Sequence, residues 1–121
     1  MQPAKNQHFL RRLRYALAGV AYGIRNEHSF KTQAFAFAAA LIALLIIRPA
    51  PVWWALIFLA SAGILAAELL NTAIEVLADH LHPEQHRNIR IVKDCAAAAV
   101  LLMVAGALGS ALALMIDVIR R

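Results

Sequence analysis

The sequence predicts an all-α membrane protein with three membrane-spanning helices and an amphipathic surface helix at its N-terminal end. Of the 121 residues, 62% are hydrophobic and only 16% are charged, whereas a soluble domain carries about 25% charged residues. The apolar residues fall into three runs, each approaching the roughly 20 residues that an α-helix needs to cross a bilayer. We therefore expect one integral-membrane domain over residues 1–121, with little chain left for a separate soluble module.

The N-terminal helix is expected over residues 9–24. Its apolar residues recur three and four positions apart with arginines between them, a pattern typical of a helix that lies on a membrane or packs on the protein's own spans. Polar residues 26–29 then interrupt the pattern, and Ser29 is expected to cap a helix that begins at Phe30. A bend is therefore predicted at this point.

The three membrane spans are expected at residues 34–47, 52–70 and 95–116. The first span draws extra length from residues 30–33 and ends before the Pro-Ala-Pro segment at 49–51, which cannot continue a helix. The second span opens with two interfacial tryptophans, and its helical periodicity continues to about Leu81. A polar connection over residues 82–93 leads to the alanine-rich third span.

The basic residues predict the orientation of the chain. With three spans, the N-terminal end and the second connection share one side of the membrane, and that side holds nine of the twelve Lys and Arg residues. Such an excess marks the cytoplasmic side. Because the basic residues flank apolar runs, the net charge of +5 indicates contact with lipid headgroups and no nucleic-acid partner.

Five polar residues at helical spacing are expected to share one face of the second long helix: Glu68, Asn71, Thr72, Glu75 and Asp79. Acidic side chains near the end of an apolar span are costly unless they are paired, protonated or bound to metal, so they are functional candidates. We expect Glu27 from the bend, and Lys93 with Asp94 from the third span, to converge on this face. A polar seam that only holds helices together is the alternative left open.

The chemistry of this group indicates a nucleotide-dependent phosphotransferase. Carboxylates without thiolates suit Mg²⁺, which usually binds through one or two carboxylates plus substrate phosphates, while a lysine neutralises phosphate charge. There is no glycine-rich Walker sequence, so side chains and metal would have to grip the nucleotide. Four histidines would allow a zinc site instead: His28, His80, His82 and His86. Because Pro83 lies between His82 and His86, these two side chains are not expected to share one face of a regular helix, and the nearby carboxylates explain the site without zinc. Solvated interfacial histidines are therefore the simpler interpretation.

The stretch Glu68-Leu-Leu-Asn71-Thr72-Ala-Ile-Glu75, followed by Asp79 and by Lys93-Asp94 before an alanine-rich span, resembles the bacterial integral-membrane diacylglycerol kinase family. The resemblance covers nearly the whole chain and includes Asn26-Glu27 and the segment 84–86. It implies a homotrimer in which magnesium-ATP donates its γ-phosphate to the hydroxyl of a membrane lipid. It also implies that each site is built from two neighbouring chains.

The resemblance implies roles for individual residues. Glu68 would be the catalytic general base, Asn71 would support it and the phosphates, and Glu27 with Glu75 would hold Mg²⁺. The nucleotide would contact eight residues: Tyr15, Glu27, Glu75, Glu84, Gln85, His86, Lys93 and Asp94. Near Tyr15 the sequence departs from the family, because His8 or a shifted Arg11 stands in place of an expected arginine and Ala16 in place of a serine.

Two lipid substrates are compatible with this family, diacylglycerol in Gram-negative bacteria and undecaprenol in Gram-positive bacteria. Asn26-Glu27 resembles the first branch, so we expect diacylglycerol to be converted to phosphatidic acid at the cytoplasmic face of a bacterial inner membrane. A non-catalytic assembly or transport subunit is the alternative from another class. A packing seam does not need so many acids at one boundary, and a transporter more often places ionisable groups near the midplane.

Overall fold

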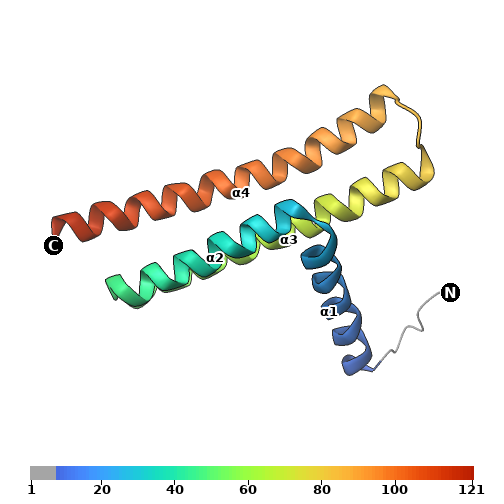
Figure 1. Cartoon of the computed structure of the whole chain (residues 1–121). Coiled ribbons are helices and arrows are strands. Elements are labelled where there is room, and N and C mark those ends of the chain that lie inside the picture. The colour runs from blue at the N-terminus through green and yellow to red at the C-terminus, as the bar shows by residue number, and fades with distance from the viewer. Residues whose placement is uncertain (1–7) are drawn as a thin grey trace.

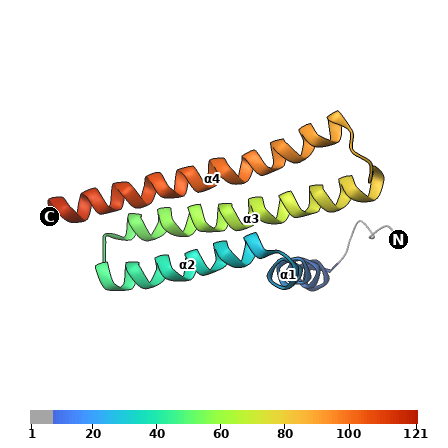
Figure 2. The ribbon, with the colours of Figure 1, turned by 45° about the horizontal axis from the view of Figure 1, so that its top comes forward.

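Four helices make up the part of the chain that the computed structural model describes, residues 8–121. They are α1 (Phe9–Asn26), α2 (His28–Ile47), α3 (Pro51–Leu81) and α4 (Arg87–Arg120). α2, α3 and α4 run side by side as an elongated bundle, with α3 between the other two, whereas α1 leaves the bundle at a steep angle (Figures 1 and 2). The predicted all-α fold is confirmed.

Each of the three bundle helices is long and apolar enough to cross a membrane. Large apolar side chains such as Phe35, Ile46 and Leu102 point outward and are more than two-thirds exposed on the single chain. Water would not favour such a surface, but lipid tails are as apolar as these side chains. The bundle is therefore a membrane protein with three candidate spans.

A buried core cluster lies at the end of the bundle far from α1. Leu44 of α2, Ile57 of α3 and Leu114 of α4 form a buried cluster there, flanked by Trp53 and Trp54. Arg48 reverses the chain between α2 and α3 in the left-handed region, with φ 51°, and Pro51 occupies the first turn of α3, where a missing N–H costs no hydrogen bond.

The bend between α1 and α2 consists of Glu27 alone. The prediction that Ser29 caps a helix beginning at Phe30 is wrong, because α2 already begins at His28. Glu27 occupies the cap position in an extended conformation, and its carbonyl accepts a hydrogen bond from the Lys31 N–H over 3.2 Å. The Glu27 side chain makes no capping hydrogen bond, so its carboxylate is free to face α3.

α4 begins earlier than the sequence predicts. Residues 87–93, expected as part of a polar connection, form its first two turns. His86 caps this helix by accepting a hydrogen bond from the Asn88 N–H at its Nδ1 over 3.1 Å, and no Gly or Pro follows in residues 87–93 to break the helix. The connection is therefore limited to residues 82–86, where Pro83 prevents α3 from continuing.

Candidate active site

The polar face predicted for α3 forms where α1 and α2 meet that helix. Glu68 and Thr72 are each only 7% exposed, and they are the two buried polar side chains of residues 8–121. Asn71 and Glu75 on the same face are partly buried. A carboxylate so deeply placed on an apolar helix requires a compensating partner.

Three acidic residues lie close enough in this region for their charges to interact. The charges of Glu27 and Glu75 act directly on the carboxylate of Glu68, Glu27 from the bend and Glu75 from two turns further along α3. Within residues 8–121, none of these three forms an ion pair with a Lys, Arg or His. Like charges in partly buried positions repel one another strongly. A cation bound beside Glu27 and Glu75 would reduce this repulsion, and carboxylate oxygens are ligands that Mg²⁺ takes.

Asn71 fixes one of these carboxylates. Its Nδ2 donates a hydrogen bond to Oε1 of Glu75 over 3.3 Å, along one turn of α3. Its Oδ1 is buried and has no hydrogen-bond partner within the described part of the chain. Asn71 therefore orients Glu75, and it keeps one acceptor free beside the carboxylates.

A second polar region lies at the end of α3 and the start of α4. A cavity of about 460 Å³ opens there. Its lining includes five of the residues expected to contact nucleotide: Glu84, Gln85, His86, Lys93 and Asp94. Arg87 and Arg90 add positive charge to the same cavity. Both arginines occupy adjacent turns of α4 and therefore face one cavity. The sequence did not single them out, because residues 82–93 were predicted to form an irregular connection.

The site residues expected to converge form two neighbouring groups in one chain: the carboxylates Glu27, Glu68 and Glu75, and the residues that line the cavity. Lys93 does not pair with the three carboxylates but forms an ion pair with Asp79, Nζ to Oδ1, over 2.6 Å. Asp94 lies 3.9 Å from Arg90 within α4. Asp79 lies one turn after Glu75 on α3 and also lines the cavity, so the three carboxylates and the cavity are one helical turn apart at this point.

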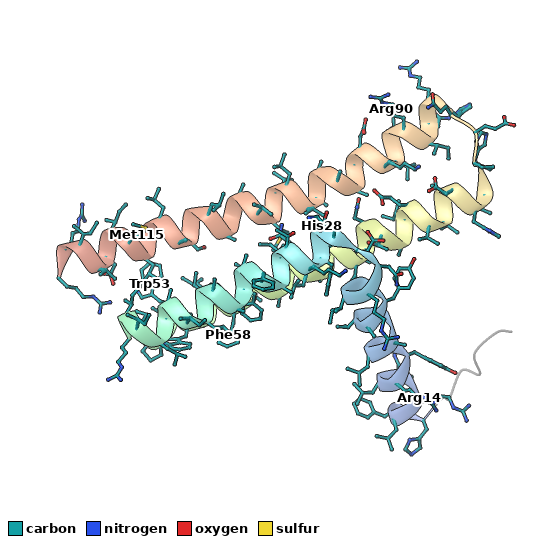
Figure 3. All side chains as sticks on the ribbon, viewed as in Figure 1. Arg14, His28, Trp53, Phe58, Arg90 and Met115 are labelled. Atoms are coloured by element: carbon teal, nitrogen blue, oxygen red, sulfur yellow. The ribbon has the colours of Figure 1, made fainter. Side chains whose placement is uncertain are left out.

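Tyr15 lies apart from both groups. It sits on α1 and is 56% exposed, and it does not line the cavity between α3 and α4. Figure 3 shows the neighbouring Arg14 well away from Arg90 at the cavity. Within one chain, Tyr15 and the cavity are therefore separate.

Two histidine rings lie close together in the connection between α3 and α4. The rings of His82 and His86 have centroids 5.4 Å apart and are tilted by 59°. Nδ1 of His82 lies 3.0 Å from the Glu84 carbonyl, which fits a donated hydrogen bond. Across residues 8–121, no three His, Cys, Asp or Glu side chains are grouped so that they could hold a metal ion by themselves. A metal at the carboxylates would need further ligands, and Mg²⁺ commonly takes these from water and phosphate.

An apolar groove adjoins the carboxylate face. It lies between α1 and α3, has a volume of about 560 Å³, and is lined by Gly19, Tyr22, Leu69, Thr72, Ala73, Val76, Leu77 and His80. Its α3 residues are rotated by roughly 100° from Glu68 and Glu75 around the helix axis. Thr72 belongs to both faces, so the groove and the carboxylates share an edge.

These features define a class: a three-span helical membrane protein in which carboxylates without an ion-pair partner in residues 8–121 lie near an apolar groove and a polar cavity. The family model described as prokaryotic diacylglycerol kinase matches residues 14–115, and the chain belongs to this family. The family expected from the residues is thereby confirmed.

Two curated relatives carry different names. The diacylglycerol kinase of Synechocystis sp. is 37% identical over 90 residues, covering 74% of this chain and 51% of that protein. The undecaprenol kinase of Bacillus subtilis is 35% identical over 92 residues, covering 76% of this chain and 75% of that protein. The matched region thus spans about half of the first relative and three-quarters of the second.

Proposed function

We propose that this protein is a lipid kinase that uses ATP and Mg²⁺ to phosphorylate a membrane lipid hydroxyl, with diacylglycerol as its preferred substrate and phosphatidic acid as its product. One observation carries the proposal: Glu27, Glu68 and Glu75, which have no ion-pair partner in residues 8–121, lie near a groove suited to lipid and a cavity suited to phosphate, both of which α3 helps to line. The names of the two relatives support the reaction class.

Glu27 and Glu75 would hold the magnesium ion. Both present carboxylate oxygens without a competing cation, and Glu75 is already oriented by Asn71. When bound, Mg²⁺ neutralises charge on the phosphates of ATP. Because Mg²⁺ usually retains water and phosphate ligands, two carboxylates are sufficient on the protein side.

Glu68 would act as the general base. It precedes Glu75 by seven residues, or about 10 Å along the helix, and therefore lies deeper in the membrane. A lipid hydroxyl sits below the headgroup phosphates, so its proton acceptor belongs on the membrane side of the metal. The carboxylate of Glu68 would accept that proton as the hydroxyl oxygen attacks the γ-phosphorus and ADP leaves.

The lipid chains would enter the groove between α1 and α3. Its lining is almost entirely apolar, and Thr72 at its edge brings it beside the carboxylates. Hydrocarbon in this groove would direct the hydroxyl end of the lipid toward Glu68. α1 would then have two functions, lying on the membrane surface with its arginines among headgroups and forming one wall of the lipid site.

The nucleotide would occupy the cavity between α3 and α4. Lys93, Arg87 and Arg90 supply positive charge for the phosphates, while the other expected contacts are Glu84, Gln85, His86 and Asp94. We propose a homotrimer in the bacterial inner membrane with this cavity on the cytoplasmic side. A neighbouring chain would contribute Tyr15 and complete the site.

A phosphorylation assay with purified protein tests the function. Labelled ATP is offered with diacylglycerol or undecaprenol in matched micelles, and the products are separated by thin-layer chromatography. We expect a higher specificity constant for diacylglycerol. A higher constant for undecaprenol would favour the second candidate, undecaprenol kinase, which the Bacillus subtilis relative supports. Phosphorylation of neither lipid would contradict the proposed function.

A further inference from the structure

The ion pair between Asp79 and Lys93 is the one that joins two helices in residues 8–121. The other two, Arg90 with Asp94 and Arg121 with Asp117, are local pairs four residues apart. The pair joins the last turns of α3 to the second turn of α4, where both residues line the cavity. No role for Asp79 follows from the reaction as proposed above.

The position of Asp79 determines where the Lys93 ammonium lies. A lysine side chain has four rotatable bonds, so an unrestrained ammonium at the start of α4 would sample much of the surrounding solvent. The contact of 2.6 Å holds it against α3, one turn beyond Glu75. The neighbouring Asp94 is not its ion-pair partner, because Asp94 lies 3.9 Å from Arg90.

The pair leaves Lys93 able to bind a second anion. An ammonium has three N–H donors, and one is directed at Asp79 Oδ1. The Lys93 side chain is still 37% exposed and Asp79 63% exposed. Exposed ion pairs of this kind add little to folding stability. The geometry therefore suits orientation of a charged group better than stabilisation of the fold.

We propose that Asp79 is a positioning residue, which holds the Lys93 ammonium at the cavity wall, one turn beyond Glu75, so that it meets the phosphates of the nucleotide. This inference rests on the proposed function, since it assigns Asp79 a part in binding the ATP of that reaction. Asp79 itself does not contact the nucleotide. Its effect passes through Lys93.

A double-mutant cycle tests this dependence. Asp79→Asn, Lys93→Met and the double variant are compared for the dissociation constant of magnesium-ATP, measured by equilibrium titration without turnover, and for KM and kcat in lipid phosphorylation. We expect Asp79→Asn to raise the dissociation constant and the KM for ATP by about three- to tenfold, in the lower part of the range of coupling between contacting residues. The KM for lipid and the Tm should stay unchanged.

Two further variants sharpen the test. Asp79→Glu restores the charge and is expected to recover most of the ATP affinity. Asp117→Asn removes a carboxylate from another exposed ion pair, at the opposite end of α4, and should not change ATP affinity. In the double variant, Asp79→Asn should add nothing to the loss caused by Lys93→Met.

Three results would overturn the inference. Tighter ATP binding in Asp79→Asn would mean that Asp79 sequesters Lys93, unchanged binding would remove its role, and additive losses in the double variant would mean that it acts independently. Nucleotide titration separates these outcomes from the proposed function. If the effects of Asp79→Asn and Lys93→Met on ATP affinity are non-additive but the protein phosphorylates no lipid, only the kinase proposal is refuted. If the effects are additive and the protein is an active lipid kinase, only the role of Asp79 is refuted.

Discussion

Trp53 donates a hydrogen bond from its indole Nε1 to Oδ2 of Asp117 over 3.1 Å, and this bond joins the first turn of α3 to the last turns of α4. Figure 3 shows Trp53 reaching toward α4 at the end of the bundle opposite the carboxylate group. The same Asp117 oxygen accepts a hydrogen bond from Arg121. One carboxylate thus fastens two helices at the membrane boundary far from the site.

Replacing Trp53 with Phe should destabilise the bundle without impairing the reaction. The change keeps an aromatic ring but removes the N–H donor, which costs about 1 kcal/mol of unfolding free energy. Thermal unfolding in detergent measures the loss. Trp54→Phe is the matched control because Trp54 stacks on Phe58 and leaves the bond to Asp117 intact. Equal losses in the two variants would show that the hydrogen bond contributes nothing specific.

Glu27→Gln and Glu75→Gln should each abolish phosphorylation at ordinary magnesium concentrations. Both remove a charge that the site needs to hold the metal beside the triphosphate, while amide and carboxylate have nearly the same shape. Activity is measured across a magnesium series, and the oligomer by size-exclusion chromatography, where it should remain intact. Near-wild-type turnover at limiting magnesium would contradict the metal assignment, and loss of assembly before loss of activity would favour a packing seam.

Glu68→Gln should lower kcat by on the order of a hundredfold or more, because the variant keeps the hydrogen-bonding shape but cannot accept the proton of the lipid hydroxyl. The stability of the oligomer and the binding of magnesium-ATP should remain largely unchanged, since Glu68 lies deeper than the metal site. Single-turnover rates and ATP titrations separate the two effects. If ATP affinity falls together with kcat, Glu68 belongs to the metal or nucleotide site.

Gly23 should be sensitive to any side chain, because α1 closely approaches α3 there. A Cβ at Gly23 would lie 2.9 Å from Leu69 Cδ2 and 3.1 Å from Phe30 Cγ. Gly23→Leu should destabilise the fold by about 1–3 kcal/mol. It should also raise the magnesium requirement, because Glu27 follows one turn later.

Smaller substitutions provide the control for Gly23. Gly106→Ala meets no atom of the chain within 4 Å and should gain up to about 1 kcal/mol from helix propensity. Gly23→Ala should lose most of that gain to its contacts, and thermal unfolding compares the two. An equal gain in both variants would mean that the approach of α1 to α3 is not tight in solution.

Helical periodicity was sufficient to predict the bundle and its polar face. The recurrence of Glu68, Asn71, Thr72, Glu75 and Asp79 specifies one face of a helix, and no Pro or Gly occurs between Glu68 and Leu81. Its boundaries were harder to predict. Ser29 is a good capping residue, yet Glu27 takes that position, and the polarity of residues 87–93 concealed a helix capped by His86.

The pairing of side chains could not be predicted from spacing. The sequence predicts that Glu27, Lys93 and Asp94 approach α3, but it does not state which group meets which. Lys93 pairs with Asp79 and Asn71 with Glu75 because of helix rotation and packing, which periodicity describes only to within a fraction of a turn. Only the three-dimensional arrangement therefore shows that the site residues divide into the three carboxylates and a separate cavity.

The unbroken length of α3 makes the thickness of the surrounding bilayer a variable of the proposed reaction. Its 31 residues form a rod of about 46 Å, against roughly 30 Å of hydrocarbon, and Glu68 and Glu75 are fixed on it. The depth of a diacylglycerol hydroxyl is set by the lipid leaflet, whereas the depth of Glu68 is set by its position on α3. A thicker or thinner leaflet would shift the hydroxyl past its proton acceptor, so turnover should pass through a maximum as the acyl chains of the host lipids are lengthened.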